Sequence, residues 1–507
     1  MIFNYSANNL NIKDQKKQRL FEILPGAISW GILLCLLFLE IFNPLTAAIL
    51  ILAYIFYWFL RLLYMTIFLV ISYRRYRKEK NTDWMEGISI LSKANNFTED
   101  IKHLVIIPVA TEPREVVEPG IKSIAESRFS PDKILVVLAL EERAKEEVVK
   151  GVMGIKEKYK DSFMDLIVAI HPDGIEGEAM AKGANATYAA KVAAEYFSKH
   201  NVEYGNVIAS CFDSDTVVAK DYFAALTYYF ISTTDRQRAS FQPIPIYNNN
   251  IWDAPGVTRV FEIGSSFFQL IEATNAEKLV TFSSHSMSFK ALVEIGYWPV
   301  DMVSDDSAIF WKAFIHYEGK YRVVPMYTTV SMDAVVGEGV WGTFKNVYKQ
   351  RRRWAWGVEN FPIIMRAFLK STKITLYDKF RLILKLFEGQ ISWVTAPFIL
   401  TVFGWVPSLI ARHTISHAAV YYNAPYVDGV IFQLSTISLI ISIILSIFLL
   451  PSKKTKESFK NKVVTAVSWL AIPFTIVFLS AIPALDAQTR LMLGKYMTFW
   501  VTDKKRT

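Results

Sequence analysis

The chain combines long, uninterrupted apolar stretches with segments in which apolar and polar residues alternate. Two apolar stretches, Leu24–Phe42 and Leu45–Ile71, follow one another near the N-terminus. Each has roughly the 20 residues that a helix needs to cross ~30 Å of hydrocarbon. The pattern predicts a transmembrane hairpin over residues 24–73, preceded by a cytoplasmic leader over residues 1–23.

Basic residues flank this predicted hairpin. They gather in residues 13–19 before it and in residues 74–80 after it. Because cytoplasmic loops are enriched in Lys and Arg, both ends of the hairpin are predicted to face the cytoplasm. The first stretch is predicted to be an uncleaved anchor. Arg61 lies inside the second stretch, where it either faces a polar cavity or extends to the interface.

Residues 100–350 are globular in composition, and short β-rich runs alternate there with segments of helical spacing. Such alternation predicts an α/β domain with a mostly parallel sheet and helices on both faces. Ligands bind such sheets at the carboxyl ends of the strands. The predicted strands are His103–Val109, Lys133–Leu140, Leu166–Ile170 and Asn206–Phe212, and the predicted helices are Glu115–Glu126, Glu141–Lys158 and Gly177–His200.

The rest of the chain becomes apolar again. Residues 351–388 are amphipathic and basic, which is typical of helices at a membrane interface. Residues 389–486 contain three apolar runs that are predicted transmembrane segments, and residues 487–507 form a tail. Basic residues before and after the last run both favour the cytoplasm, so one run is predicted to be interfacial or re-entrant. The runs are Ile391–Ala411, Val427–Leu450 and Val463–Leu485.

Composition agrees with a membrane protein that carries a soluble domain. The 507 residues are 52% hydrophobic and 20% charged, with a formal net charge of +9. The basic residues follow the apolar segments instead of one aromatic-interleaved groove, which excludes nucleic acid as a predicted partner. The two cysteines, Cys35 and Cys211, cannot build a disulfide framework or a zinc cluster, and both are expected in packed interiors.

The first candidate site follows the fourth predicted strand, which ends in Asp213-Ser214-Asp215. Two carboxylates one residue apart can hold a divalent cation that bridges to phosphate oxygens. Upstream, Lys182 and Asn185 stand among small residues, where the backbone can approach a diphosphate. Taken alone, the Asp-Ser-Asp motif is also typical of a surface loop, and Lys182 is also typical of a solvated lysine.

Two further motifs lie downstream. Ser304-Asp305-Asp306 follows a Gly-Tyr-Trp-Pro turn, and the segment Gln350–Trp354 reads Gln-Arg-Arg-Arg-Trp before the amphipathic stretch. As isolated features they are typical of an acidic helix cap and of a basic, tryptophan-containing membrane belt. Their order along the chain is what favours a common site.

In this order the motifs resemble those of the inverting family 2 glycosyltransferases, specifically the membrane-integrated branch that includes cellulose, chitin and hyaluronan synthases. The resemblance runs from about His103 to Asn360. It implies a GT-A-type nucleotide-sugar transferase domain joined to a helical transmembrane region. It also implies a nucleoside-diphosphate sugar as donor and a divalent metal, Mg²⁺ or Mn²⁺, as cofactor.

Residue roles follow from the same resemblance. Asp213 and Asp215 are expected to bind the metal, and Asp306 is expected to act as the base that accepts the proton of the acceptor hydroxyl. The residues expected to bind the donor are Glu112, Glu141, Lys182 and Asp213, and those expected near the acceptor and the diphosphate are Asp305, Gln350, Arg353 and Trp354.

Three positions depart from the family pattern. The turn that ends in Glu112 lacks the usual aromatic residue, and the second strand ends in Glu141 and Glu142 where two aspartates are usual. Both positions face the nucleobase in the family, and uridine is the expected base. The motif that ends in Asp306 reads Ser-Asp-Asp instead of Thr-Glu-Asp and keeps the last carboxylate.

Three other segments are candidates. Gln242–Pro255 contains two aromatic residues and three asparagines, and it is predicted either to shape a sugar pocket or to form an ordinary loop. His285 lies in a family loop near the acceptor. The C-terminal tail resembles the gating loop of cellulose synthase-like enzymes, although a membrane anchor has the same aromatic and basic composition. Its matching positions are Phe499, Val501, Thr502 and Lys504.

The predicted function is transfer of a sugar, with inversion, from a UDP-sugar to a growing polysaccharide that passes through the spans of the protein. One alternative is addition of a single sugar to a polyprenyl phosphate or a glycolipid. Another is a non-catalytic transport or scaffold subunit. Membrane lipids are expected partners, and the predicted location is the plasma membrane, with several spans and a cytoplasmic catalytic domain. The sugar, its linkage and the oligomeric state are left open.

Overall fold

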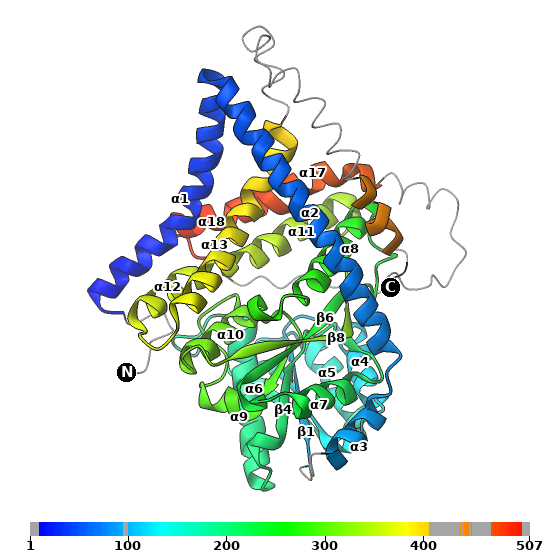
Figure 1. Ribbon diagram of the computed structural model, residues 1–507. Coiled ribbons are helices and arrows are strands. Elements are labelled where there is room, and N and C mark those ends of the chain that lie inside the picture. The colour runs from blue at the N-terminus through cyan, green and yellow to red at the C-terminus, as the bar shows by residue number, and fades with distance from the viewer. Residues whose placement is uncertain are drawn as a thin grey trace.

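The computed structural model describes residues 10–94, 100–404, 436–438, 440–445, 448 and 468–498. A sheet with its covering helices forms one end of the molecule, and long helices form the other (Figure 1). The pair α1 (Ile12–Phe42) and α2 (Pro44–Lys80) rises furthest from the sheet (Figure 1). Between the apex of this pair and the sheet domain lie α11 (Gly339–Ala355), α17 (Ile472–Ile476) and α18 (Ile482–Met492) (Figure 1).

The sheet has eight strands in the order β3-β2-β1-β4-β7-β6-β8-β5. Strands β1 to β4 are paired in parallel, as predicted. Strand β7 is antiparallel to both of its neighbours, and β8 runs parallel to β6, so the later strands make the sheet mixed. The strands are β1 Lys102–Val109, β2 Ile134–Glu141, β3 Asp165–His171, β4 Val207–Cys211, β5 Val217–Val218, β6 Ala239–Tyr247, β7 Ser286–Ser288 and β8 Arg322–Met332.

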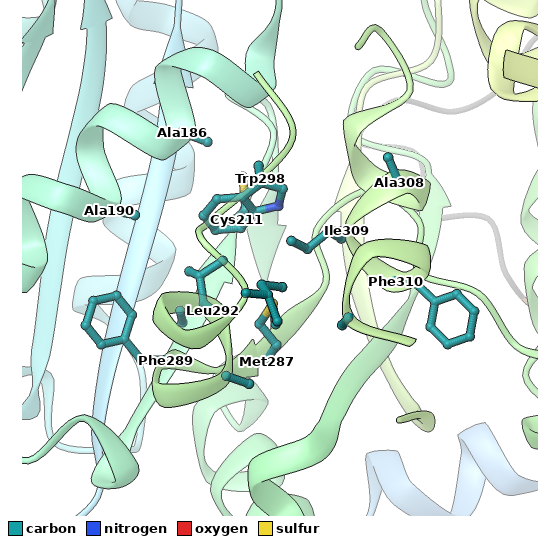
Figure 2. Close-up of a cluster of buried hydrophobic side chains, with 14 of the residues drawn as sticks. Ala186, Ala190, Cys211, Met287, Phe289, Leu292, Trp298, Ala308, Ile309 and Phe310 are labelled. Carbon is teal, nitrogen blue, oxygen red and sulfur yellow. The ribbon is translucent and has the colours of Figure 1, made fainter. Parts of the chain in front are cut away.

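Apolar side chains fill both faces of the sheet. One core joins α4, α5 and α7 to the strands, and the other joins α6, α9 and α10 to them. Figure 2 shows the second core, where Ala186 and Ala190 of α6, Ile309 of α10, Cys211 and Trp298 belong to one buried cluster. The helices of this domain are α3 Trp84–Ala94, α4 Arg114–Ala125, α5 Glu146–Tyr159, α6 Lys182–Lys199, α7 Tyr222–Ser232, α8 Gly256–Glu272, α9 Phe289–Glu294 and α10 Asp305–His316.

Four helices of the described residues are long and apolar enough to cross a membrane, by length and composition: Ile12–Phe42, Pro44–Lys80, Leu376–Phe403 and Ile472–Met492. They include one π-helical turn at the end of α13 and another between α17 and α18. The helices of this part are α1 Ile12–Phe42, α2 Pro44–Lys80, α11 Gly339–Ala355, α12 Asn360–Lys370, α13 Leu376–Phe398, α17 Ile472–Ile476 and α18 Ile482–Met492.

The boundaries of these helices differ from the predicted segments. The end of the predicted interface stretch, residues 376–388, shares one helix with the start of the span that follows it, because α13 begins at Leu376 and continues to Phe398. Most of the predicted run Val427–Leu450 lies outside the described residues, and the last run is described only from Ser468. Helix α1 carries Cys35 on its exposed side, whereas Cys211 is buried. The prediction of a packed position is therefore confirmed for Cys211 and wrong for Cys35.

From Ile12 on, the predicted N-terminal leader is part of α1, and polar contacts hold it. Gln18 accepts from Arg366 Nε of α12 at 2.7 Å and donates to Glu22 Oε1 at 3.0 Å. The Tyr496 hydroxyl donates to Glu22 Oε2 at 3.0 Å, and Arg19 donates to the Leu491 carbonyl oxygen at 2.8 Å. These bonds tie the start of α1 to α12 and to the end of α18.

Helix α2 is fixed at its middle and near its C-terminal end. Arg61 forms an ion pair with Glu388 of α13 and lies 4.7 Å from the centre of the Trp58 ring. The charge inside this apolar helix is therefore balanced by a charge on a neighbouring helix. Further along α2, Arg75 donates to the Tyr327 hydroxyl at 3.1 Å, which anchors the helix to β8.

His103 gives the folded domain a dependence on pH. Its ring is fully buried in β1, lies 2.8 Å from Thr227 Oγ1, and packs against Phe129 and Phe223. Burial lowers the pKa of His103 to about 3, so the native state keeps the ring neutral. The unfolded chain protonates it below its ordinary pKa of about 6.5.

Stability is therefore complete above about pH 6.5 and falls as the pH approaches 3, since the unfolded state then binds more protons. We expect the wild type to lose about 1 kcal/mol between pH 7.5 and 5.5 from this group alone. A His103→Leu variant should show a smaller difference in unfolding temperature between the two pH values. An equal difference in both proteins would contradict this assignment.

Candidate active site

Three charged side chains meet at the carboxyl end of β4. Lys182 is the first residue of α6, Asp213 follows β4, and Asp306 lies in the first turn of α10. The Lys182 ammonium donates to Asp213 Oδ1 at 2.7 Å and to Asp306 Oδ1 at 2.8 Å. One lysine thus joins two carboxylates that come from different elements, and all three residues were candidates from the sequence.

The charge balance of this cluster keeps the lysine protonated. Burial disfavours the charged form of Lys182, but Asp213 and Asp306 outweigh it and hold the pKa of the ammonium well above its ordinary value. The Lys182 side chain is 11% exposed, whereas those of Asp213 and Asp306 are 23% and 27% exposed. The carboxylates are therefore the part of the cluster that solvent or a ligand can reach.

Gly183 allows α6 to approach α10 closely. A Cβ atom at this position would lie 2.5 Å from the Pro299 carbonyl oxygen and 3.0 Å from Asp305 Cβ. A backbone oxygen cannot rotate out of the way, so any larger residue must separate the two segments. The glycine after Lys182 is thus what brings the lysine within reach of Asp306.

The loop before β7 supplies a second contact to Asp213. Ser283 Oγ donates to Asp213 Oδ2 at 2.5 Å. Gln242 of β6 holds this loop, because its Oε1 accepts from the Phe282 N–H at 2.7 Å. Ser283 was not predicted as a contact residue, and its only signal in the sequence is its position beside His285.

His285 is part of the same loop but carries no charge. Its Nδ1 lies 3.0 Å from the Phe282 carbonyl oxygen, which requires a proton on Nδ1. Burial lowers the pKa of His285, and the ring is neutral near pH 7. Its approach to Asp306 Oδ1 at 3.9 Å is therefore not an ion pair.

The acidic start of α10 is held by residues next to α12. Glu359 accepts from the Ser304 N–H at 2.8 Å and from its hydroxyl at 2.7 Å, and Asn360 donates to Ser304 Oγ at 2.9 Å. Asp305 is buried, and burial together with the neighbouring Asp306 charge raises its pKa. Glu359 was not predicted, because its sequence surroundings do not distinguish it from a solvated glutamate.

Asp215 belongs to a separate set of contacts and is only 1% exposed. Its Oδ2 accepts from the Asp333 N–H at 2.9 Å. Asn249 donates to the Asp215 carbonyl oxygen at 3.0 Å and to Asp333 Oδ1 at 3.0 Å. In the loop Gln242–Pro255, Asn250 likewise exchanges hydrogen bonds with Ala334. Both amides hold the loop against the end of β8, which favours the ordinary-loop interpretation for them.

Asp213 and Asp215 are the aspartates that would hold a metal at this site, and such a metal would share its ligands with a substrate. Within the described part of the chain, no three His, Cys, Asp or Glu side chains converge into a metal site. Mg²⁺ in phosphate-transferring sites is usually held by only one or two carboxylates, and phosphate oxygens and water supply the other ligands. Asp213 and Asp215 offer that number of carboxylates at the end of one strand.

A depression opens beside this cluster at the ends of β2 and β3. Glu141, His171 and Glu178 line it, together with Ala181, which directly precedes Lys182. His171 Nε2 lies 2.9 Å from Glu178 Oε2. Acidic side chains outnumber the one arginine among the lining residues, so the depression suits hydroxyl and amide donors better than it suits phosphates. His171 and Glu178 had not been predicted to share it with Glu141.

Glu112 has a different environment. Its Oε2 accepts from the N–H groups of Ala110 at 2.8 Å and Thr111 at 3.0 Å. The carboxylate therefore closes the turn that follows β1. Its expected contact with the donor stays a prediction.

The segment Gln350–Trp354 forms the last turns of α11. The Trp354 ring lies 5.7 Å from the Tyr247 ring, and Gln350 is buried. The charge of Arg353 acts on Asp305 and so lies near the start of α10. The predicted gating positions Phe499, Val501, Thr502 and Lys504 lie outside the described residues.

A comparison with protein families decides what this site belongs to. Residues 210–481, more than half of the chain, match the model of "Glycosyl transferase family group 2". This chain is a family 2 glycosyltransferase. The predicted combination of a GT-A-type α/β domain and apolar, membrane-type helices is confirmed for the glycosyltransferase.

Among curated proteins, the glycosyltransferase is similar to poly-beta-1,6-N-acetyl-D-glucosamine synthases. It is 25% identical to the enzyme of Staphylococcus aureus (strain COL) over 346 residues, which are 67% of this chain and 70% of that protein. It is 30% identical to the enzyme of Staphylococcus aureus (strain MSSA476) over 191 residues, which are 36% of this chain and 42% of that protein.

Among solved structures, the glycosyltransferase is similar to mannosyltransferase PcManGT from Pyrobaculum calidifontis, in complex with GDP-Man and Mn2+. The TM-score is 0.41 at 13% identity, covering 85% of this chain and 100% of that one. It is also similar to S. aureus TarS 1-349 in complex with UDP-GlcNAc, with a TM-score of 0.36 at 12% identity, covering 80% of this chain and 95% of that one.

The close packing at Gly183 predicts a steric effect on this site. We expect Gly183→Ala to destabilise the protein by about 1–3 kcal/mol and to lower its unfolding temperature, because Cβ would overlap the Pro299 carbonyl oxygen. The matched control is Gly264→Ala in α8, where a Cβ would meet nothing within 4 Å. That control should leave stability unchanged or raise it by up to about 1 kcal/mol. Equal unfolding temperatures for both variants would show that α6 and α10 can separate at little cost.

Proposed function

We propose that this glycosyltransferase moves a sugar from a UDP-sugar to a growing polysaccharide and passes the polymer through its own spans. The observation that supports this function best is the Lys182 bridge between Asp213 and Asp306. It unites a donor-side carboxylate, a cation suited to a diphosphate and a possible base in one accessible cluster. The catalytic domain is proposed to face the cytoplasm of the plasma membrane, where nucleotide sugars are made.

The relatives suggest which donor to test first. The curated proteins named above are poly-beta-1,6-N-acetyl-D-glucosamine synthases. We therefore take UDP-N-acetylglucosamine as the first candidate donor and an N-acetylglucosamine polymer as the first candidate product. The acidic depression lined by Glu141 is the proposed place for the nucleoside, since a carboxylate can accept from ribose hydroxyls and from the uracil N–H.

The proposed reaction is a single displacement at the anomeric carbon. Asp306 accepts the proton of the acceptor hydroxyl, and the resulting oxygen nucleophile forms a bond to that carbon. The bond from the carbon to the diphosphate oxygen breaks, and the nucleoside diphosphate leaves with the electron pair. Lys182 and Arg353 neutralise the charge that develops on the leaving diphosphate, which stabilises the transition state. The displacement inverts the configuration of the anomeric carbon.

Asp213 and Asp215 are the residues that would hold Mg²⁺ or Mn²⁺. Such an ion supplies Lewis-acid neutralisation of the diphosphate charge. The Lys182 contact to Asp213 is proposed to give way when the donor arrives, because the diphosphate offers the ammonium a more highly charged partner. On the acceptor side, Trp354 supplies a flat apolar face and Gln350 supplies an amide.

The test is release of UDP by the detergent-purified protein with UDP-N-acetylglucosamine and Mn²⁺, with sizing of the product. We expect Asp306→Asn to lower turnover about 10²-fold or more, because a general base contributes that much. Asp301→Asn, five residues earlier, is the matched control and should keep nearly full activity. Turnover that persists in Asp306→Asn would refute the assignment of the base.

Product length separates the proposed function from its alternatives. Long polymer supports a synthase, whereas one sugar on an added polyprenyl phosphate or glycolipid supports the single-addition alternative. If no donor in a panel of UDP-, GDP- and dTDP-sugars is consumed, with lipid acceptors present, the non-catalytic alternative holds.

Metal removal is a separate test of the donor side. We expect EDTA to abolish UDP release and excess Mn²⁺ to restore it. Asp213→Asn should weaken Mn²⁺ binding in the presence of UDP, as followed by the loss of free Mn²⁺ signal in electron paramagnetic resonance. Unchanged Mn²⁺ binding in this variant would refute the proposed ligand.

A further inference from the structure

A buried ion pair lies beneath the tryptophan of the Gln350–Trp354 segment. Glu262 of α8 is fully buried, and Arg351 of α11 is 6% exposed. Arg351 Nη2 donates to Glu262 Oε2 at 2.9 Å and to Ser265 Oγ at 2.7 Å. The two charges come from helices that are far apart along the chain, and neither was a candidate for function from the sequence.

This pair is expensive for the fold and is incompletely satisfied. Burial raises the pKa of Glu262, and the nearby Arg351 opposes that effect. Glu262 Oε1 and Arg351 Nε are buried and have no hydrogen-bond partner among the described residues. A buried ion pair often adds less stability than apolar residues of the same volume. Stability alone therefore does not explain this pair, which indicates another role.

The guanidinium of Arg351 lies close to two aromatic rings. Its central carbon lies 4.1 Å from the centre of the Trp354 ring and 4.4 Å from that of Phe261. The Trp354 ring is also 5.7 Å from Tyr247, at an angle of 38°. The contacts with Arg351 and Tyr247 restrict the orientation of the Trp354 ring more than apolar packing alone would.

The aromatic pair lies next to the donor side of the site. Burial raises the pKa of the Tyr247 hydroxyl, and the charges of Glu262, Asp213 and Asp215 raise it further. Tyr247 is therefore near both the Glu262–Arg351 pair and the Asp213–Asp215 motif. A sugar that packs on Trp354 would be close to the anomeric carbon of a bound donor.

We propose that Glu262 and Arg351 are positioning residues that orient the Trp354 ring as the platform for the acceptor sugar. The proposal rests on the function proposed above. Glu262 fixes the plane of the guanidinium, and the guanidinium fixes the plane of the indole. Both residues act through Trp354 in this proposal, so their loss should affect acceptor use and leave donor binding intact.

The activity test compares sugar transferred to product with UDP released by hydrolysis, using UDP-N-acetylglucosamine and Mn²⁺. We expect Glu262→Gln to lower the ratio of transfer to hydrolysis about tenfold. Its affinity for UDP with Mn²⁺ should stay within about twofold of wild type, which a general structural defect would not allow. Arg351→Lys keeps the charge but loses the planar contact, and it should lower the ratio as well.

The control is Glu272→Gln on the same helix, where the ion pair with Lys385 is remote from Trp354. This variant should keep the wild-type ratio. An unchanged ratio in folded Glu262→Gln would overturn the proposal, and so would a parallel loss of UDP affinity.

A second measurement does not depend on activity. Protein labelled with 5-fluorotryptophan gives a ¹⁹F resonance for Trp354 that a Trp354→Phe variant identifies. We expect Glu262→Gln to shift or broaden this resonance and Glu272→Gln to leave it unchanged. If the wild type transfers no sugar but the resonance responds, the proposed function fails and the positioning role stands. If the resonance does not respond, the positioning role fails.

Discussion

The site depends on one ammonium group placed between two carboxylates. Asp213 and Asp306 come from separate elements, and two such charges repel each other unless a cation lies between them. Lys182 supplies that cation. Its reach requires α6 to lie against the segment before α10, which in turn requires Gly183 and the alanines of the adjoining core. The electrostatics of the site and the packing of this face of the sheet are therefore a single constraint.

The first half of the sheet could be predicted from the sequence because its signal is local. Strands β1 and β2 are nearly continuous apolar runs, as strands covered on both faces must be. Their polar ends mark the edge where ligands bind, and Lys182, Asp213 and Asp306 follow from that rule together with the family pattern. The three residues do meet in the structure.

Contacts between distant segments could not be predicted in the same way. Glu262, Ser283 and Glu359 look like ordinary surface residues until the fold supplies Arg351, Asp213 and Ser304 as partners. The predicted boundary between interface helix and span, after residue 388, was wrong for a related reason. The composition changes from amphipathic to apolar along α13, but the helix continues through that change. After residue 212, β5 and β7 have only two and three residues, and β6 and β8 contain prolines and a register shift, so the alternation of polar and apolar residues is weak there.

The contacts at the start of α1 have a consequence for how the protein is made. Arg19 and Glu22 are synthesised among the first residues, yet they bond to Leu491 and Tyr496, which are among the last of those described. Until Leu491 and Tyr496 have been synthesised, these charged groups must stay hydrated or bond to other partners. The helical layer can therefore reach its final arrangement only after translation has passed α18, so its assembly is a late, post-translational event, whereas the sheet domain can fold while the chain is still growing.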